Sequence, residues 1–563
     1  MKIKILSPEV HAKIAAGEVI ERPAYIVKEL IENALDAQAK TVQISLKDHG
    51  MTAITVKDDG VGMDREDLTQ AYLPHATSKI TAVEDLSNIS SFGFRGEALA
   101  SIAAIGTLTI KSRAQHESVG SSIVIRQSKA SEIESCGMAP GTIVEVADVF
   151  QSIPARKKFL ASATAEYRRM LDIILRFAIM HHTVRFEVIH NNSVVHIFPK
   201  TDNLATRLED IFSDEITAEV FPVNFEYEYI VLTGFSGKPS LRYTSTRNIY
   251  IFINGRMVKE STINAAIKEA YASLLDVHSY PFTVLQITLP AHMLDVNIHP
   301  RKEQVMFADP TLMRETLIAS FREALTAHDL TFATGKWQTT KKESDRWVKE
   351  ANPMKSHAAK TLKSKILRSQ TAKDSDYIQL HNTYIVTSVD NETIIVDQHA
   401  AHERVLYEQF VSEYQAELQK KKQVSLAKQI RFNLNPVELT VLSEHQAAVT
   451  DLGFTYTLEE NAVVVTEVPE LFKDRDIKQI FTDIIDGLGE TGGATNLDNI
   501  SHRMLTYLSC KNAVKAGQEL AVEQQKEIIK KLFETESPYT CPHGRPTHIS
   551  LPLKDLEKMF HRR

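Results

Sequence analysis

The chain carries the sequence IVKELIENALDA at residues 26–37 and the sequence ITVKDDGVG at residues 54–62. In the first stretch apolar residues recur at helical spacing, so three acids and Asn33 share the opposite face of a predicted helix. Such a face is also typical of any solvated amphipathic helix. The second stretch predicts a strand that ends in two aspartates and two glycines, where a ligand can approach the backbone closely.

Two further stretches favour a ligand site over a solvated helix face. Residues 75–79 read HATSK, and residues 92–99 read FGFRGEAL. A glycine-rich loop that enters a helix offers free backbone N–H groups and the positive end of the helix dipole to phosphate groups. The four stretches together therefore predict a nucleotide site.

Length, composition and charge narrow the class of protein. A chain of 563 residues is too long for one hydrophobic core, so several domains are expected. No apolar run approaches the roughly 20 residues that span a bilayer, and the N-terminus lacks a secretory pattern, so we expect a cytoplasmic protein. The three cysteines are too few for a disulfide framework, and the net charge of -7 argues against a uniformly basic nucleic-acid coat.

The pattern along the chain predicts two folded regions separated by a basic linker. Strands are predicted at Val42–Leu46, Ala53–Val56, Thr107–Ser112 and Ser122–Arg126, which indicates a mixed α/β region up to about residue 333. Residues 336–373 contain eleven Lys or Arg against three acids, and both tryptophans, Trp337 and Trp347. Such a segment cannot bury enough apolar surface to offset its ordering entropy, so we interpret it as a flexible linker.

Two segments predict further elements on either side of the linker. Strands at Ile249–Asn254 and Phe282–Thr288, with a helix at Thr262–Leu275 between them, indicate a βαβ crossover in a second subdomain. After the linker, strands are predicted at Thr383–Val389 and Thr393–Asp397. A helix from about Ala401 follows, and the region from Leu434 to Glu534 is predicted to be more helical.

Three segments of the C-terminal region carry residues that bind metals. Residues 397–408 read DQHAAHERVLYE, which puts His399 and Glu403 on one face of a helix. Such a pair alone is more often a surface pair. However, residues 509–515 read SCKNAVK and residues 541–546 read CPHGRP, so two of the three cysteines lie in potential ligand segments. Mixed Cys, His and carboxylate ligands suit Zn²⁺, whereas a carboxylate-rich neighbouring position suits Mn²⁺ or Mg²⁺.

The four N-terminal stretches resemble the GHKL ATPase family, which is shared by DNA gyrase, histidine kinases, the ninety-kilodalton heat-shock chaperones and MutL. Within it, the MutL branch is indicated by FGFRGEAL, by LDVNIHPRKE at residues 294–303, by Gly141-Thr142, and by PARKKFL at residues 154–160. The resemblance covers nearly all of the first 330 residues. A chaperone or topoisomerase on the same ATPase fold is the more remote alternative.

The resemblance implies roles for residues of the nucleotide site. Glu29 is expected to be the general base, and Asn33, at i+4, to hold Mg²⁺ between the phosphates of ATP. Asp58 is expected to bind the adenine with support from Thr142, beside Gly60 and Gly62. Lys302 is expected to reach the γ-phosphate, although composition alone favours an exposed lysine in a turn. The implied lid over the triphosphate consists of Thr77, Ser78, Lys79, Gly93, Phe94, Arg95 and Gly96.

The C-terminal segments are similar to the endonuclease motif of MutL proteins that nick DNA themselves. By this resemblance Asp397 and Glu403 are catalytic. Arg562, in the closing FHR sequence, stabilises the site or contacts phosphate. A sliding-clamp motif is also expected, but the candidate at residues 423–428, QVSLAK, lacks the usual proline. The implied metal ligands are His399, Glu403, Glu408, Cys510, Cys541 and His543.

The resemblance implies a multidomain α/β and α+β protein. The expected parts are a GHKL ATPase sandwich at 1–204, a ribosomal-protein-like βαβ subdomain at 205–333, the flexible linker at 334–373, and an α+β dimerisation and endonuclease domain at 374–563. The implied function is a homodimeric mismatch-repair ATPase that couples recognition by MutS to DNA incision, with the replicative sliding clamp as a further partner. The alternative is a mismatch-repair matchmaker without nuclease activity, with a structural zinc site.

Overall fold

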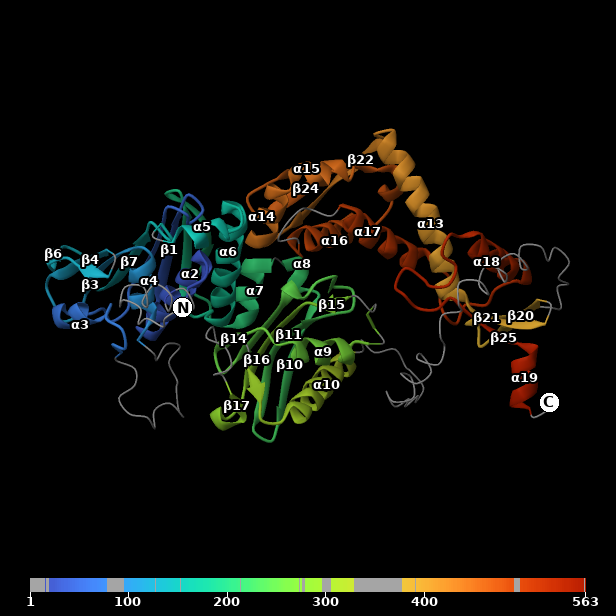
Figure 1. Ribbon diagram of the computed structural model, residues 1–563, viewed down its shortest axis with the longest axis horizontal. Coiled ribbons are helices and arrows are strands. Elements are labelled where there is room, and N and C mark those ends of the chain that lie inside the picture. Colours follow the sequence, from blue (N-terminus) through green and yellow to red (C-terminus); the bar gives the residue numbers. More distant parts are fainter. Residues whose placement is uncertain are drawn as a thin grey trace, which may run out of the picture. The chain divides into compact units, whose positions relative to one another are not determined.

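The computed structural model (Figure 1) describes residues 20–77, 96–126, 128–151, 153–212, 214–272, 274–275, 279–295, 305–328, 377–389, 391–490 and 497–560, with positions 16 and 562. The chain divides into two compact units, one built mainly from residues before 329 and the other mainly from residues after 376. The predicted basic linker and both tryptophans lie outside the described residues. Among the described residues, no helix combines the length and apolar character needed to cross a membrane.

A nine-stranded sheet forms the core of the first unit, in the order β5-β4-β3-β7-β2-β1-β8-β9, with β6 paired to β4. Neighbouring strands run antiparallel except β1 and β8, which are parallel. The four strands predicted in this region are confirmed. The strands are β1 (Thr41–Lys47), β2 (Ala53–Asp58), β3 (Thr107–Arg113), β4 (Gly120–Arg126), β5 (Lys129–Ala130), β6 (Glu134–Cys136), β7 (Gly141–Ala147), β8 (Arg185–His190) and β9 (Ser193–Phe198).

The helix predicted at residues 26–37 is α2 (Pro23–Asp36), which packs on α6 (Ala163–Met180). It starts at Pro23, because proline fits the first helical turn, where its missing N–H costs nothing. Its apolar residues are buried in the core that the sheet shares with α6. The other helices of this region are α3 (Arg65–Gln70), α4 (Ala98–Ile105), α5 (Pro154–Lys158), α7 (Leu204–Phe212) and α8 (Asp214–Thr217).

A five-stranded sheet, β10-β11-β16-β13-β14, follows in the same unit, together with α10 (Pro310–Ala327). All five residues of β13 are buried, and β13 runs parallel to β16 with α9 (Ser261–Ala270) between them in the chain. The predicted βαβ crossover is therefore confirmed. The strands are β10 (Val220–Tyr227), β11 (Ile230–Gly237), β13 (Ile249–Ile253), β14 (Arg256–Val258) and β16 (Thr283–Thr288).

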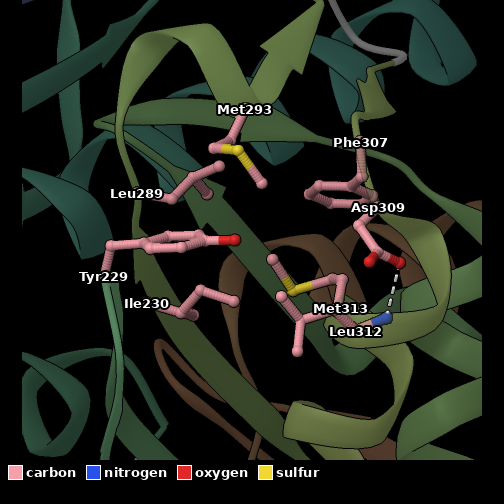
Figure 2. A pocket seen from close by; sticks show the side chains of 8 residues that line it. All are labelled: Tyr229, Ile230, Leu289, Met293, Phe307, Asp309, Leu312 and Met313. Carbon is pink, nitrogen blue, oxygen red and sulfur yellow. Dashed lines mark hydrogen bonds between the residues drawn. The ribbon is translucent and has the colours of Figure 1, made fainter.

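A small cavity lies beside the short strands β17 (Leu294–Asp295) and β18 (Met306–Phe307) of this subdomain (Figure 2). Its volume is about 10 Å³, which is room for about one water molecule and far too little for a nucleotide. Apart from Asp309, its lining is apolar or aromatic. The lining residues are Tyr229, Ile230, Leu289, Met293, Phe307, Asp309, Leu312 and Met313.

The second unit contains an antiparallel four-stranded sheet in the order β19-β20-β21-β25. One face of this sheet packs into an apolar core with the long helix α13 (Gln398–Gln419) and with α18 (Val522–Glu534). Helix α13 also packs against α17 (Leu497–Asn512). The strands are β19 (Tyr377–Leu380), β20 (Tyr384–Val389), β21 (Glu392–Asp397) and β25 (His548–Pro552).

The region from Leu434 to Glu534 is less helical than its sequence suggested. A three-stranded sheet, β22-β24-β23, places β23 (Thr455–Leu458) and β24 (Ala462–Pro469) inside it, and β22 (Gln423–Asn433) precedes it. The reason is the run of valines in β24, since β-branched residues pack well in a buried strand. The remaining helices are α14 (Pro436–Glu444), α15 (Gln446–Asp451), α16 (Ile477–Glu490) and α19 (Leu553–Met559).

Candidate nucleotide site and candidate metal centre

The polar face of α2 holds the first part of the candidate nucleotide site. Glu29 and Asn33 are both partly exposed and stand one helical turn apart. Glu32, by contrast, is buried in an ion pair with Lys28, whose Nζ lies 2.8 Å from Glu32 Oε1 and 3.6 Å from Glu29 Oε1. Lys28 thus lies at ion-pair distance from both carboxylates. The burial of Lys28 was not predicted from the sequence.

A second cation, Arg256 at the start of β14, also acts on the carboxylates of α2. Burial lowers the pKa of Arg256, and the charges of Glu32, Asp36 and Glu29 oppose that shift. Nothing in the sequence near Arg256 indicated this role, because β14 lies more than 200 residues from α2. The second subdomain thus contributes positive charge to the same helix face.

The two aspartates at the end of β2 have different environments. Asp59 Oδ1 accepts hydrogen bonds from the backbone N–H groups of Lys40 (2.7 Å) and Thr41 (2.8 Å), so Asp59 fixes the start of β1. Asp58 is buried, and its Oδ1 accepts the N–H of Gly60 at 2.9 Å. Burial raises the pKa of Asp58 to about 6, although hydrogen bonds from Gly60 and Thr142 oppose the shift. Asp58 is therefore the aspartate suited to bind a ligand.

Thr142 lies directly across the β2–β7 pair from Asp58 and across the β3–β7 pair from Ser112. The hydroxyl groups of Thr142 and Ser112 are 2.9 Å apart, and Ser112 Oγ also accepts the N–H of Met63 at 2.8 Å. Both side chains are buried. Ser112 is a residue that the sequence analysis missed, because it lies in an ordinary strand pattern and is brought beside Thr142 only by the sheet.

Glycines allow the backbone of this site to approach its neighbours closely. Gly62 has a φ of +70°, and a Cβ there would lie 2.1 Å from the carbonyl oxygen of Arg113. Gly141 has a φ of +126°, and a Cβ there would lie 2.2 Å from the carbonyl oxygen of Asp58. A side chain at Gly62 would push the backbone away from Arg113, and a side chain at Gly141 would push it away from Asp58. Either change would open the site.

The expected lid is described only at its two ends. Thr77 and Gly96 lie within the described residues, and the backbone N–H of His75 donates to the carbonyl oxygen of Gly96 at 2.9 Å. The start and the end of the expected lid therefore lie close together. The other predicted lid residues and the predicted phosphate sensor fall outside the described residues, namely Ser78, Lys79, Gly93, Phe94, Arg95 and Lys302.

The candidate metal centre begins at the N-terminus of α13. Asp397 is the N-cap, and its Oδ1 accepts the N–H of Ala400 at 2.9 Å. His399 and Glu403 follow in the first turns, on the same side of the helix, as their spacing predicts. His399 Nδ1 donates to the carbonyl oxygen of Val514 at 2.8 Å, which leaves Nε2 as a lone-pair donor for a metal.

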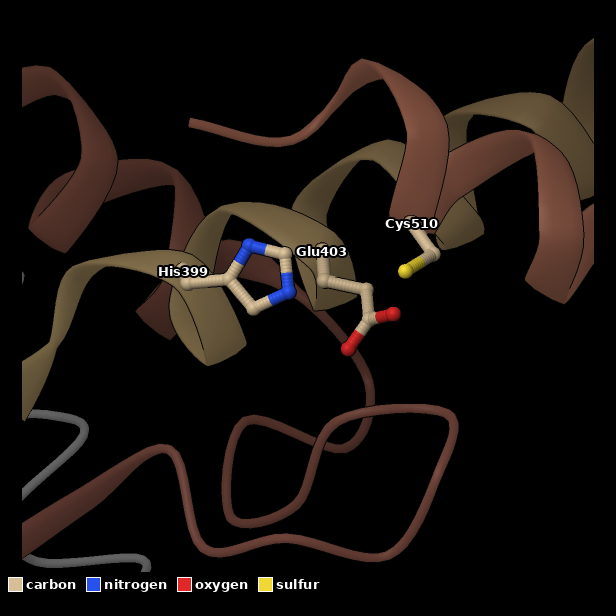
Figure 3. Close-up of side chains that lie close together, drawn as sticks. All are labelled: His399, Glu403 and Cys510. Atoms are coloured by element: carbon tan, nitrogen blue, oxygen red, sulfur yellow. The ribbon is translucent and has the colours of Figure 1, made fainter. Parts of the chain in front are cut away.

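Two groups of potential ligands share Glu403. In the first group the ligand atoms of His399, Glu403 and Cys510 all lie within 4.8 Å of one another (Figure 3). In the second, the same limit holds for Glu403, Cys541 and His543. The structure thus brings together five of the six residues predicted as ligands, from α13, from the end of α17 and from the segment before β25.

The local chain path explains how Cys541 and His543 reach Glu403. Gly544 N–H donates to the carbonyl oxygen of Cys541 at 2.9 Å, which closes a β-turn with Pro542 in its favoured second position. Thr540 and Pro546 form a β-bridge across the base of this turn. The turn therefore presents two ligands from one short segment.

The surroundings of Glu403 fit a metal ligand. Burial would raise the pKa of Glu403, but the neighbouring His543, with smaller effects of Cys541 and His399, outweighs burial, and the net pKa is lowered. Glu403 Oε1 is buried without a hydrogen bond of good geometry, although His543 Nδ1 lies 2.7 Å away. Such an anionic, under-satisfied oxygen beside sulfur and imidazole ligands suits Zn²⁺.

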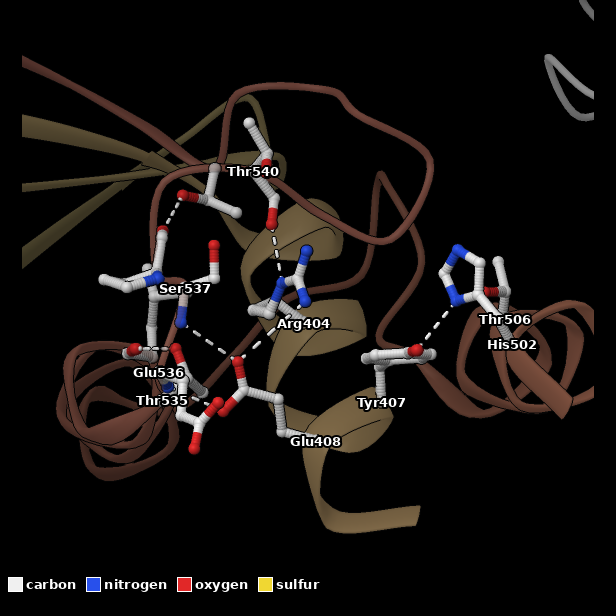
Figure 4. Close-up of polar contacts among 12 residues, drawn as sticks. Arg404, Tyr407, Glu408, His502, Thr506, Thr535, Glu536, Ser537 and Thr540 are labelled. Carbon is white, nitrogen blue, oxygen red and sulfur yellow. Dashed lines mark hydrogen bonds and ion pairs between the residues drawn. The ribbon is translucent and has the colours of Figure 1, made fainter. Parts of the chain in front are cut away.

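Glu408 and Arg562 are not part of either group. The Glu408 carboxylate accepts the backbone N–H groups of Glu536 (2.7 Å) and Ser537 (3.1 Å), so its assignment as a ligand does not agree with this geometry (Figure 4). The physical reason is helical phase, since five residues rotate Glu408 about 140° away from Glu403. Arg562 is exposed after α19, and its backbone N–H donates to Glu557.

Comparisons with known proteins show the family of the chain. Three protein-family models match: the histidine kinase-, DNA gyrase B- and HSP90-like ATPase at 21–150, the DNA mismatch repair protein C-terminal domain at 208–326, and the MutL C terminal dimerisation domain at 377–520. The DNA mismatch repair protein MutL of Clostridium acetobutylicum is 33% identical, with 100% of both chains covered. The chain belongs to the MutL family of DNA mismatch repair proteins.

Further relatives extend this result. MutL of Caldanaerobacter subterraneus subsp. tengcongensis is 33% identical over 100% of this chain and 99% of its own length. The crystal structure of the N-terminal domain of a DNA repair protein has a TM-score of 0.50 and 22% identity, covers 57% of this chain and 99% of that chain, and supports the fold. The expected mixed α/β fold, the GHKL ATP-binding domain and the MutL dimerisation domain are thereby confirmed.

Proposed function

We propose that this MutL-family chain is an ATP-dependent switch that couples mismatch recognition by MutS to incision of one DNA strand by its own metal-dependent endonuclease site. The observation that carries the proposal is the convergence of His399, Glu403, Cys510, Cys541 and His543 from three distant segments. The alternative of an accidental surface pair on α13 does not account for the two cysteines that meet Glu403.

In the ATPase domain, Glu29 orients and deprotonates the attacking water, and its partial exposure leaves it accessible to that water. Asn33, one turn away, would hold the Mg²⁺ that accompanies ATP. Asp58 accepts a hydrogen bond from the exocyclic amine of adenine, and Thr142 supports it across the β2–β7 pair. The lid residues and Lys302 contact the triphosphate, and Lys302 senses the γ-phosphate from the second subdomain.

In the endonuclease site, Zn²⁺ or Mn²⁺ would supply positive charge for the cleavage of a phosphodiester and would make water more acidic. His399, Glu403, Cys510, Cys541 and His543 hold the ions. Asp397 keeps one oxygen on the helix N-terminus and adds negative charge next to His399, which favours cation binding. We assign Arg562 to contact with DNA phosphate, since its side chain is exposed.

The outer face of the four-stranded sheet supports homodimer formation. Ile378, Val386, Ile395 and Ile549 stand opposite one another across β19, β20, β21 and β25, and their row lies on the face away from the apolar core. Ile378 is 56% exposed and Ile549 is 47% exposed. A continuous apolar row of this kind is typical of a protein interface, and we propose a second copy of the chain as its occupant.

The remaining partners are DNA, MutS and the sliding clamp. The basic segment at 336–373 provides non-specific, salt-dependent attraction to DNA phosphate. The clamp candidate QVSLAK forms the start of β22, where most side chains are exposed or half-buried. MutS and the clamp follow from the family resemblance.

Nicking of supercoiled plasmid tests the proposal. The wild-type protein should convert supercoiled plasmid to the nicked form with Mn²⁺ or with Zn²⁺ and Mg²⁺, and Asp397→Asn should lower nicking about 100-fold or more while ATP hydrolysis is unchanged. Asparagine can still cap α13, so the helix should remain intact. Normal nicking by Asp397→Asn, or none by the wild type with any of these metals, would reject the endonuclease assignment.

The second candidate function is a matchmaker whose C-terminal ligands hold a structural zinc ion. It is favoured by the burial of Cys541 and Glu403, because a closed set of protein ligands is typical of structural zinc. In that case zinc removal would lower the thermal stability of the C-terminal domain, and no metal would support nicking.

A further inference from the structure

Two side chains of α13 hold the segment that carries Cys541 and His543. Arg404 Nε donates to the carbonyl oxygen of Thr540 at 2.6 Å, one residue before Cys541 (Figure 4). The Glu408 carboxylate accepts the N–H groups of Glu536 and Ser537, which follow the C-terminal end of α18. The segment from 536 to 540 is thus bound to α13 at both of its ends.

Helix geometry separates these two residues from the metal ligands on the same helix. Arg404 and Glu408 are four residues apart and share one face, as His399 and Glu403 share another. Arg404 Nη1 lies 3.9 Å from Glu408 Oε1, which is at the limit of an ion pair. Both side chains make shorter contacts with backbone atoms of the 536–540 segment. A hydrogen bond between a charged side chain and the backbone is stronger than one between two neutral groups.

We propose that Arg404 and Glu408 are positioning residues for the metal centre. They fix the 536–540 segment against α13, so that the turn at Cys541–Gly544 presents Cys541 and His543 to Glu403. The proposal rests on the proposed function only in assuming that the centre binds metal. Glu408 accordingly belongs to the same sequence stretch as the ligands because it orients two of them, without binding the ion itself.

This role predicts a loss of metal affinity rather than a loss of fold. Groups that orient metal ligands change metal affinity about 10- to 100-fold when they are removed. The core beneath α13 does not use Glu408, whose side chain is 24% exposed. Removing its carboxylate should therefore leave the metal-free protein folded and release the turn that carries two of the five ligands.

The test is a Co²⁺ titration of the full-length, metal-free protein, followed by the absorption of the thiolate-to-cobalt charge-transfer band. We compare wild type, Glu408→Ala, Glu408→Gln and the control Glu413→Ala. Glu413 is an exposed glutamate of the same helix, and it accepts a hydrogen bond only from Gln409 among the contacts described for it. Glu408→Ala should weaken Co²⁺ binding about 10-fold or more and reduce the band, while Glu413→Ala matches wild type.

The outcomes separate this proposal from the proposed function. If the wild type gives no charge-transfer band, the metal centre itself is rejected together with the positioning role. If the wild type gives the band and Glu408→Ala binds Co²⁺ equally well, only the positioning role is rejected. A lower melting temperature of metal-free Glu408→Ala with unchanged Co²⁺ affinity would also reject it.

A second pair of variants covers the case in which Glu408→Ala fails to fold. Glu408→Gln keeps one oxygen that can accept one of the two N–H groups, so it should show a smaller loss, of a few-fold. Arg404→Ala should reproduce the loss of Glu408→Ala, because it releases the other end of the same segment. Wild-type affinity in both variants would overturn the proposal.

Discussion

The candidate nucleotide site and the candidate metal centre are built in opposite ways. Asp58 and Thr142 are neighbours in one sheet, and Glu29 and Asn33 are neighbours in one helix, so secondary structure alone sets most of the geometry of the nucleotide site. The metal centre instead joins the start of α13, the end of α17 and a turn before β25. Sites of the first kind depend on regular helix geometry and strand pairing, and sites of the second kind depend on packing between segments that are not paired in one sheet.

The largest expected effect breaks the nucleotide site while the metal centre stays intact. Glu29→Ala should lower ATP hydrolysis about 100- to 10,000-fold, because it removes the proposed general base, while nucleotide binding is retained. Asn33→Ala should also lose Mg²⁺-dependent binding, because it removes a proposed ligand of the ion. Turnover by stopped assay and binding by equilibrium dialysis distinguish the two variants.

Nicking activity at the candidate metal centre is the control for this prediction. Metal-dependent nicking in the absence of ATP should be the same in Glu29→Ala as in the wild type, if the two sites are assembled independently. Equal binding and equal turnover in Glu29→Ala and Asn33→Ala would contradict the division of roles on α2.

A smaller effect is expected at the outer face of the four-stranded sheet, which belongs to neither site. Ile378→Asp should raise the dissociation constant of the homodimer about 100-fold, because it buries a charge in the proposed apolar interface. Analytical ultracentrifugation of the full chain measures this change. Val194→Asp is the matched control, since Val194 is equally exposed, at 54%, but lies on β9 of the first unit. Equal dissociation of both variants would exclude the sheet face as the interface.

The smallest predicted effect sharpens the role of Asp58. Its pKa is raised to about 6, so the carboxylate is ionised at pH 7.5 and becomes protonated as the pH falls through 6. The ionised form accepts the hydrogen bond of the adenine amine more strongly than the protonated form, so ATP affinity should fall by up to about 10-fold between pH 7 and pH 5. Isothermal titration calorimetry over this range measures the fall.

Asp58→Asn provides the reference for that titration. ATP binding by Asp58→Asn should be weaker than wild-type binding from pH 7 to pH 5. Its pH dependence should lack the titration of Asp58, because the amide does not ionise in this range. The ratio of the two affinities cancels the titration of the nucleotide phosphates. A ratio that does not change between pH 7 and pH 5 would show that Asp58 does not read the base through its carboxylate.

The sequence predicted best what depends on short-range patterns. The strands β1, β2, β3 and β4 and helix α2 agree with apolar periodicity to within a few residues, and helix α9 of the crossover ends five residues before its predicted end at Leu275. The pairing of His399 with Glu403 follows from helical spacing in the same way. These features need only the local chain, so a single sequence contains enough information for them.

The rest depended on contacts that sequence spacing does not encode. Ser112 meets Thr142 only through strand pairing, and Lys28 is recognisable as a buried partner of Glu32 only once the core is formed. Glu408 was predicted as a ligand from the family resemblance, although its helical phase points it at Glu536 and Ser537. A stricter use of the 3.6-residue period would have separated Glu408 from Glu403.

Glu403 belongs to both ligand groups, and this limits what substitutions at the metal centre can separate. A substitution at His399 or Cys510 alters one group, and a substitution at Cys541 or His543 alters the other. Three of these residues, His543, Cys541 and His399, also lower the pKa of the shared carboxylate. The two groups therefore cannot be separated by a change at Glu403, and in the proposed metal centre a metal ion in one group should alter the affinity of the other. Metal titrations of this centre are expected to give apparent affinities that belong to the two groups together and not to either group alone.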